Sequence, residues 1–127
     1  NISKIVDTMA RVHGKLDLYS GNDDQIVPLM ALGGIGCISV LSNILPAETS
    51  ELCRKFLDGD VAGSAAMQYR FHDLIDALFS EVNPIPVKAA MAKMGFCSNT
   101  LRLPLTPMEE AGAERLYELM RREGINV

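Results

Sequence analysis

The chain has 127 residues, of which 48% are hydrophobic and 22% charged, and its formal net charge is −4. This composition excludes a disordered tail, and the acidic balance argues against nucleic acid or an anionic membrane surface as a partner. No apolar run approaches the ~20 residues that a membrane-spanning helix needs. We therefore expect a folded unit with a large buried core, and neither nucleic acid nor membrane as a partner.

The first third of the chain alternates between helix and strand signals. Apolar residues at a 3.6-residue spacing predict a helix over residues 2–12. His13 follows at its end, where an imidazolium would interact favourably with the helix dipole. Strands are expected over residues 16–19 and 35–41, and a helix over residues 26–32 between them. Because the connections are short, this alternation predicts parallel strand–helix units.

The rest of the chain predicts four helices. The first two cover about residues 47–57 and 61–79, the second capped by Asp60, and the third ends near Met94. Residues 106–109 (TPME) have the pattern of a capping box with proline at the first helical position, and predict a last helix reaching about residue 123.

Two strands cannot form a stable parallel sheet alone, because both edges stay open. The predicted fold class is therefore α/β: the closing strand–helix units of a (β/α)8 barrel, followed by a helical C-terminal extension. We expect residues 1–45 to hold the last barrel units, and residues 46–127 to hold the final barrel helix and the extension. The chain opens on Asn1 without an initiator methionine, so we expect processing, truncation or a longer parent protein.

Two glycine-containing motifs flank the predicted strands. SGNDD (residues 20–24) follows the first strand, at the end where barrels hold their active sites, and its glycine would let the backbone approach a ligand. A turn followed by an acidic helix start explains the same residues equally well. GGIG (residues 33–36) follows a helix and opens a strand, which is the wrong order for a phosphate loop, so we expect it to close the helix and turn the chain.

Other reactive side chains predict ordinary roles. Three cysteines without metal-like spacing favour buried, reduced thiols in a cytosolic protein. The acidic pairs at 23–24 and 109–110 are expected on solvated faces or in first helical turns, and His72 lacks partners for a metal site. No lysine is expected inside a strand facing a barrel axis, so we predict ordinary cations at Lys4, Lys15, Lys55, Lys88 and Lys93.

Three stretches together resemble the dihydrodipicolinate synthase family. They are YSGNDD (residues 19–24), LGGIGCISV with a following SN (residues 32–43), and NPIPVK with LRLPLTP (residues 83–107). The resemblance covers essentially the whole chain with matching spacing. The first two stretches are shared more loosely by sibling pyruvate aldolases such as N-acetylneuraminate lyase, whereas the third favours the synthase.

The resemblance implies a (β/α)8 barrel that condenses pyruvate with aspartate semialdehyde, in lysine and diaminopimelate synthesis, without a metal or organic cofactor. In the family a strand lysine forms an imine with pyruvate, and the protonated imine serves as electron sink. It further implies a cytoplasmic homotetramer built from dimers.

Few functional residues carry over to this chain. Gly21 matches the position where the family uses its backbone at the pyruvate end, and Ile38 matches the apolar residue that packs on bound pyruvate. The imine lysine belongs before Asn1, and Tyr19 is not the family's catalytic tyrosine, so we expect no catalytic residue in this chain. Losing the rest of the barrel removes roughly 10 kcal/mol of apolar burial, so we expect the segment to need the N-terminal part of the same barrel.

Two alternatives remain open on the sequence alone. One is a sibling pyruvate aldolase with another aldehyde partner. The other is a non-catalytic helical module that binds or regulates a partner, which the missing lysine favours for the isolated polypeptide.

Overall fold

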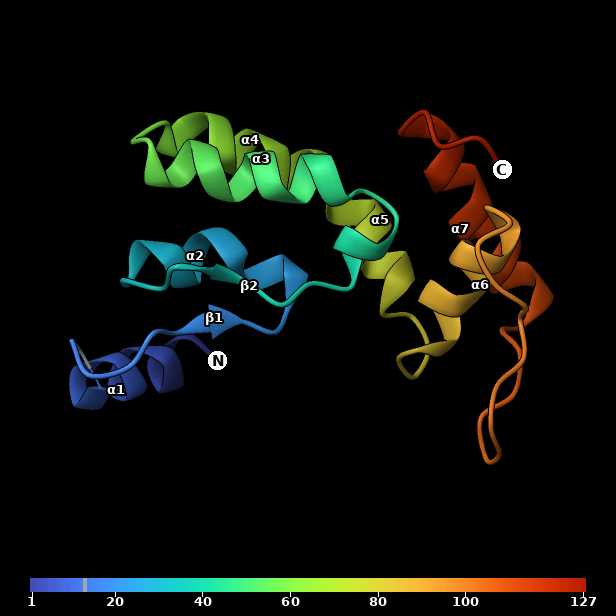
Figure 1. Ribbon diagram of the computed structural model, residues 1–127, viewed down its shortest axis with the longest axis horizontal. Coiled ribbons are helices and arrows are strands. Elements are labelled where there is room, and N and C mark those ends of the chain that lie inside the picture. The colour runs from blue at the N-terminus through green and yellow to red at the C-terminus, as the bar shows by residue number, and fades with distance from the viewer. Residues whose placement is uncertain (13) are drawn as a thin grey trace.

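The computed structural model describes residues 1–12 and 14–127, so the expectation for His13 lies outside the described residues. Helices dominate, as Figure 1 shows. The elements in chain order are α1 (Ile2–Val12), β1 (Tyr19–Ser20), η1 (Asp23–Gln25), α2 (Ile26–Ala31), β2 (Gly36–Cys37), η2 (Leu41–Asn43), α3 (Pro46–Leu57), α4 (Val61–Arg70), α5 (His72–Leu78), α6 (Ile85–Lys93) and α7 (Glu110–Arg122).

The two strands pair in parallel through a crossover that contains α2. The register places Tyr19 opposite Gly36 and Ser20 opposite Cys37. This βαβ unit is the one predicted, but each strand has two residues where residues 16–19 and 35–41 were expected. The difference arises because each strand has only the other as a partner among the described residues, and the ladder ends where their overlap ends.

The glycine pair at the end of α2 makes the turn into β2. Gly33 has a φ of +99°, a left-handed conformation that ends the helix at low cost, and its N–H donates to the Met30 carbonyl at 2.9 Å. A Cβ on Gly34 would overlap the Leu29 side chain and come within 3.2 Å of the Leu18 carbonyl oxygen. The structure thus confirms the helix-closing role predicted for this motif.

The apolar side chains form two separate clusters. The smaller lies between α2, α3 and α4 and contains the buried Ile26, Met30 and Leu52. The larger joins the segment around η2 to α5, α6 and α7, and Phe71, Leu78 and Leu116 are fully buried in it. By contrast, none of the residues described in α1 is buried.

The long helix expected over residues 61–79 is interrupted. Phe71 has φ −88° and ψ 1°, outside the helical region, and separates α4 from α5. Its ring is fully buried in the larger cluster, whereas Gln68, one turn earlier, contacts the smaller region around α2. The break lets one continuous segment serve two cores, which local spacing alone did not predict.

The predicted capping box before the last helix is wrong. α7 begins at Glu110, and its N-cap residue Glu109 is extended and makes no side-chain cap. The Glu109 N–H instead donates to Glu81 Oε1 at 3.2 Å, so a distant carboxylate satisfies one of the free N–H groups near this helix start.

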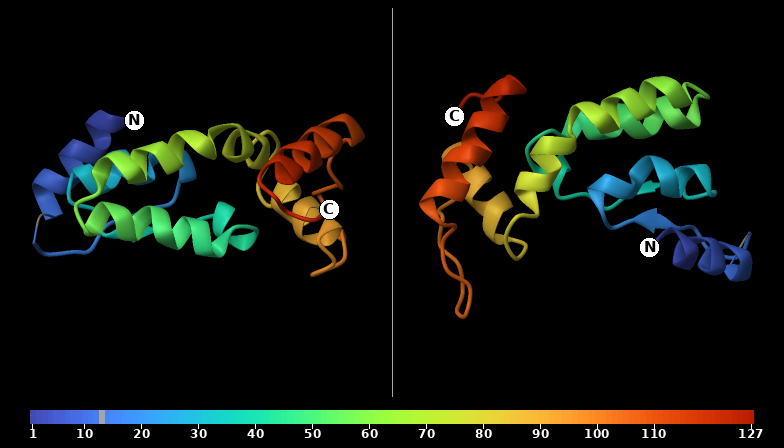
Figure 2. Two further views of the ribbon diagram at one scale, coloured as in Figure 1. Left: turned by 90° about the horizontal axis from the view of Figure 1, so that it is seen from above. Right: turned by 180° about the vertical axis from the view of Figure 1, so that it is seen from behind.

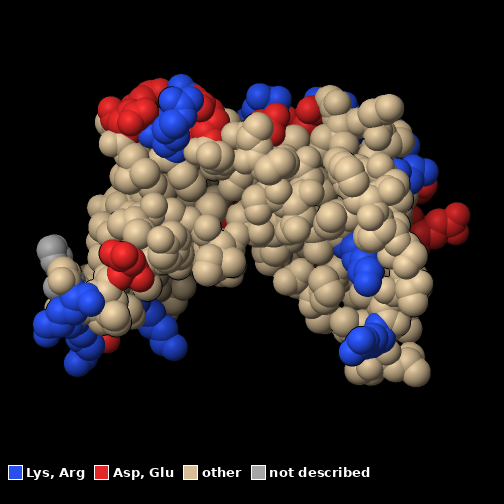
Figure 3. Space-filling model, viewed as in Figure 1, with Lys and Arg blue, Asp and Glu red and all other residues tan. Residues whose placement is uncertain are grey.

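The molecule forms an arch. Figure 2 shows α1 to α4 and the strands gathered at one end, and α6 and α7 at the other. In the view of Figure 3 the hollowed underside of the arch is mostly uncharged, and Lys, Arg, Asp and Glu gather on the outer faces. None of the helices in the described part of the chain has the length and apolar character that a bilayer crossing requires.

Candidate functional site

The structure brings the two predicted substrate-binding residues together. Gly21 and Ile38 directly follow the last paired residues of β1 and β2, at the carboxyl ends of both strands. The Ile38 N–H donates to the Ser20 carbonyl at 2.8 Å, which extends the ladder by one further bond. Carboxyl ends of parallel strands are where α/β barrels assemble their binding loops.

The space beside each of these two residues is not filled by any other part of the described chain. The Ile38 side chain is 75% exposed although it is apolar, and a Cβ added at Gly21 would meet no atom within 4 Å. Tyr19, the first residue of β1, is 48% exposed. An apolar side chain beside an open stretch of backbone is suited to contact a small ligand or the remaining barrel strands.

Asp23 joins the two loops that carry these residues. Its Oδ2 accepts hydrogen bonds from the backbone N–H groups of Val40 and Leu41 at 3.0 and 2.9 Å. The side chain is 1% exposed, and its Oδ1 has no hydrogen-bond partner within the described residues. Asp23 lies in the first turn of η1, which is one of the two expected placements, but it is not solvated, and long-range backbone donors compensate for its burial.

Gln68 ties the helical extension to the same loop. Its Nε2 donates to the Asp23 carbonyl at 2.6 Å, and its Oε1 accepts from the Val27 N–H at 3.1 Å in the first turn of α2. A side chain on α4 therefore satisfies one of the free N–H groups at the start of α2. The sequence analysis missed Gln68, because its partners lie 41 and 45 residues away and no local pattern signals them.

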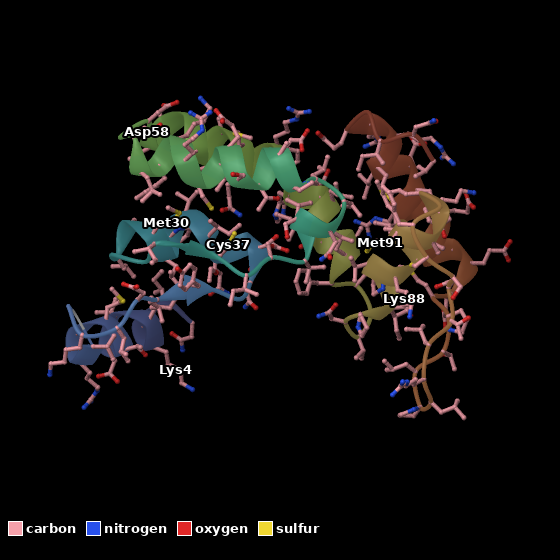
Figure 4. The ribbon with its side chains drawn as sticks, in the orientation of Figure 1. Lys4, Met30, Cys37, Asp58, Lys88 and Met91 are labelled. Carbon is pink, nitrogen blue, oxygen red and sulfur yellow. The ribbon has the colours of Figure 1, made fainter. Side chains whose placement is uncertain are left out.

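Two of the three cysteines lie against each other between β2 and α3. The Sγ atoms of Cys37 and Cys53 are 3.7 Å apart, and Figure 4 shows Cys37 on the side of β2 that faces α3. The hydrogen bond between the two thiols lowers the pKa of Cys53 to about 7, against the opposing effect of burial. The same bond, then burial, then the charges of Cys53 and Asp23 raise the pKa of Cys37. Cys97 is exposed, so the prediction of buried thiols fails there.

The lysines lie where they were predicted, on helices or at a turn. Lys55 lies 2.9 Å from Asp60, a hydrogen-bonded pairing that raises its pKa, and Lys93 lies over the Tyr117 ring at 5.0 Å. His72 is exposed at the start of α5. Among the described residues, no three His, Cys, Asp or Glu side chains gather as metal ligands would.

Parallel strand–helix units, ligand-accessible strand ends and a helical extension define the closing arc of a (β/α)8 barrel. The chain belongs to the Dihydrodipicolinate synthetase family, whose model matches residues 1–123. It is 51% identical over 125 residues to a 4-hydroxy-tetrahydrodipicolinate synthase of Lachnoclostridium phytofermentans, covering 98% of this chain and 42% of that protein. The predicted fold class is confirmed.

Two solved structures show the same arrangement. Dihydrodipicolinate synthase from Thermotoga maritima superposes with a TM-score of 0.95 at 39% identity, covering 99% of this chain and 44% of that one. The chloride-inhibited dihydrodipicolinate synthase from Acinetobacter baumannii, complexed with pyruvate, gives 0.92 at 36% identity and covers 99% and 43%. The chain thus spans less than half the length of these relatives.

Proposed function

We propose that the protein carrying this chain is a lyase that condenses pyruvate with aspartate semialdehyde to 4-hydroxy-tetrahydrodipicolinate. The observation that carries the proposal is the juxtaposition of Gly21 and Ile38 at the open carboxyl ends of paired parallel strands. A relative at 51% identity bears the name of this activity, and another was solved with pyruvate bound.

Each residue of this chain supplies a contact rather than a reacting group. Ile38 packs its exposed side chain on pyruvate, and Gly21 presents backbone to the same end of the substrate. A lysine outside these 127 residues forms the imine, which withdraws electrons so that the methyl carbon loses a proton and attacks the aldehyde. The five lysines of this chain lie on helices or at a turn, away from the strand position that this chemistry requires.

The proposal divides the chain by role. Residues 1–45 supply the last barrel units, and residues 46–127 supply the final barrel helix and the extension. The mostly uncharged hollow of the arch and the exposed Ile38 and Tyr19 are surfaces suited to the N-terminal part of the same barrel. We further propose a cytoplasmic homotetramer, which light scattering of the complete protein tests.

The test traps the imine in the complete protein. Incubation with pyruvate and borohydride, followed by intact mass and peptide mapping, is expected to place one pyruvate adduct on a lysine outside residues 1–127. Ile38→Ala is expected to raise KM for pyruvate about tenfold through lost apolar contact. Ile35→Ala is the matched control, because Ile35 is also partly exposed but lies at the opposite end of β2.

The outcomes separate the alternatives. Turnover with aspartate semialdehyde above other aldehydes supports the synthase, and the reverse preference assigns a sibling pyruvate aldolase. An adduct on the 127-residue segment contradicts the role given to its lysines. No adduct and no turnover anywhere in the complete protein assigns a non-catalytic module.

A further inference from the structure

The thiols of Cys37 and Cys53 are placed for a reaction that the proposed lyase chemistry does not use. They come from different elements, β2 and α3, and stand 16 residues apart in the chain. Their Sγ atoms are 3.7 Å apart, while a disulfide bond is about 2.05 Å long.

The pair lines an accessible hollow. A cavity of about 300 Å³ is bordered by both cysteines and by the hydroxyl-bearing Ser39, Ser42 and Ser50. Both cysteines are half-buried in the described chain, and both border this hollow.

We propose that Cys37 and Cys53 form a reversible modification site, a dithiol that low-molecular-weight disulfides oxidise to an intramolecular disulfide. The Cys53 thiolate attacks one sulfur of the external disulfide, forms a mixed disulfide and expels the first thiol. Cys37 then attacks the Cys53 sulfur, and its proton leaves with the second thiol. Two cysteine thiols are oxidised, and the external disulfide is reduced to two thiols.

The hydrogen bond between the two sulfur atoms lets one thiol ionise while the other stays protonated, so the two cysteines react in sequence. This bond lowers the pKa of Cys53, which supports Cys53 as the first to attack. The same bond, then burial, raises the pKa of Cys37. The resulting link would tie the strand that precedes Ile38 to α3.

The experiment uses the complete protein with Cys97→Ser, which removes the exposed thiol of this chain. After incubation with glutathione disulfide, remaining thiols are alkylated and the peptides are mapped by mass spectrometry. We expect one cross-linked peptide pair containing Cys37 and Cys53, lighter by two hydrogen atoms than the reduced pair and free of glutathione. Dithiothreitol should restore both thiols.

Single variants on the same background test the order of attack. With Cys37→Ser, a glutathione adduct should remain on Cys53, because the second thiol is absent. With Cys53→Ser, Cys37 should react at least about tenfold more slowly at neutral pH. Unfolding curves establish that each variant is folded. Oxidation of the protein in denaturant shows how readily the two cysteines pair in the unfolded chain.

The proposal is overturned if both thiols of the folded Cys97→Ser protein remain alkylatable, or if both stop as glutathione adducts. Faster reaction of Cys37 than of Cys53 overturns the order of attack. These readouts do not depend on turnover, so they are independent of the lyase assignment.

Discussion

The two regions of the chain bury their apolar side chains to different extents. The segment from α1 to β2 has two-residue strands, and none of the residues described in its first helix is buried. In the segment from η2 to Ile125, seventeen buried residues form one cluster. The difference indicates that α1 and the strands depend most on neighbours outside this chain, whereas α5, α6 and α7 share a core of their own.

The physical reason lies in the two kinds of secondary structure. A helix satisfies its backbone internally and needs only an apolar face to pack on, so α5, α6 and α7 stabilise one another. A parallel strand leaves one edge open until a further strand pairs with it. The barrel units therefore depend on completion of the sheet in a way that the extension does not.

Hydrogen exchange on the 127-residue chain tests this comparison most directly and has the largest expected effect. We expect amides in α5 and α7 to exchange only through global unfolding, while those of α1 exchange within about tenfold of the unfolded rate. Protection in α1 equal to that in α7 would contradict the division. When the rest of the barrel is present, amide protection should rise in α1 and β2 alone.

A pair of substitutions, one at a buried and one at an exposed apolar residue, gives the next largest effect. Phe71→Ala should lower the free energy of unfolding by about 4 kcal/mol, because the ring is fully buried in the larger cluster. Val6→Ala removes apolar atoms from a side chain that is 49% exposed, and should change it by less than about 0.5 kcal/mol. Urea denaturation measures both, and equal effects would remove the distinction between the regions.

Asp23 and Asp24 form a natural pair for testing the connection between the two strand-end loops. Asp23→Ala removes the acceptor of two backbone N–H groups and should cost about 3 kcal/mol. Asp24→Ala, at the exposed neighbour, should stay within about 0.5 kcal/mol. Asp23→Asn keeps an acceptor oxygen and should recover part of the loss in urea denaturation. Similar costs at both positions would show that the buried bonds contribute nothing specific.

Gln68→Met should cost about 2 kcal/mol, since it leaves the Asp23 carbonyl and the Val27 N–H without their shared partner. Tyr69→Phe, at the exposed neighbouring position, is the control. In the complete protein the Gln68 variant should also raise KM for pyruvate more than it lowers kcat. A loss confined to stability would show that the extension supports the fold without positioning the loop.

The sequence predicted the architecture better than the connections across it. Helical spacing and short strand–helix links were enough to infer closing barrel units. The glycine pair after α2 ends the helix and turns the chain, as predicted. Gly21 and Ile38 were found through resemblance, and parallel pairing explains why they meet. Their roles as substrate contacts remain predictions.

The missed features share one cause. Asp23, Gln68 and the Cys37–Cys53 pair acquire their roles from partners 16 to 45 residues away, which no local pattern encodes. The break at Phe71 likewise reflects a choice between two cores, because residues 61–79 have a continuous helical spacing. The last helix begins late for a similar reason, since Glu81 replaces the local cap.

The smallest expected effect is at the exposed start of α4, a helix that packs against α2 and α3. Asp60 Oδ1 accepts from the Gly63 N–H at 2.9 Å, and Oδ2 lies 2.9 Å from Lys55 Nζ. The bond to Lys55, followed by that to Gly63, lowers the pKa of Asp60 below its usual 3.8. The resulting stabilisation is present above that value and is lost as the pH falls through the folded-state pKa. The pairing raises the pKa of Lys55 above 10.5, so its share is present below that value and is lost as the pH rises.

Asp60→Asn keeps an oxygen for Gly63 but loses the ion pair. It should therefore flatten the acid limb of the stability profile slightly and leave α4 intact, because both side chains are solvent-screened. Urea midpoints between pH 2 and pH 7, compared with the exposed control Asp73→Asn, measure the change. A steep loss of α4 protection in Asp60→Asn would mean that the pair, rather than the cap and the packed face of α4, holds this helix. The C-terminal region would then depend on its surface charges in a way that its buried core does not suggest.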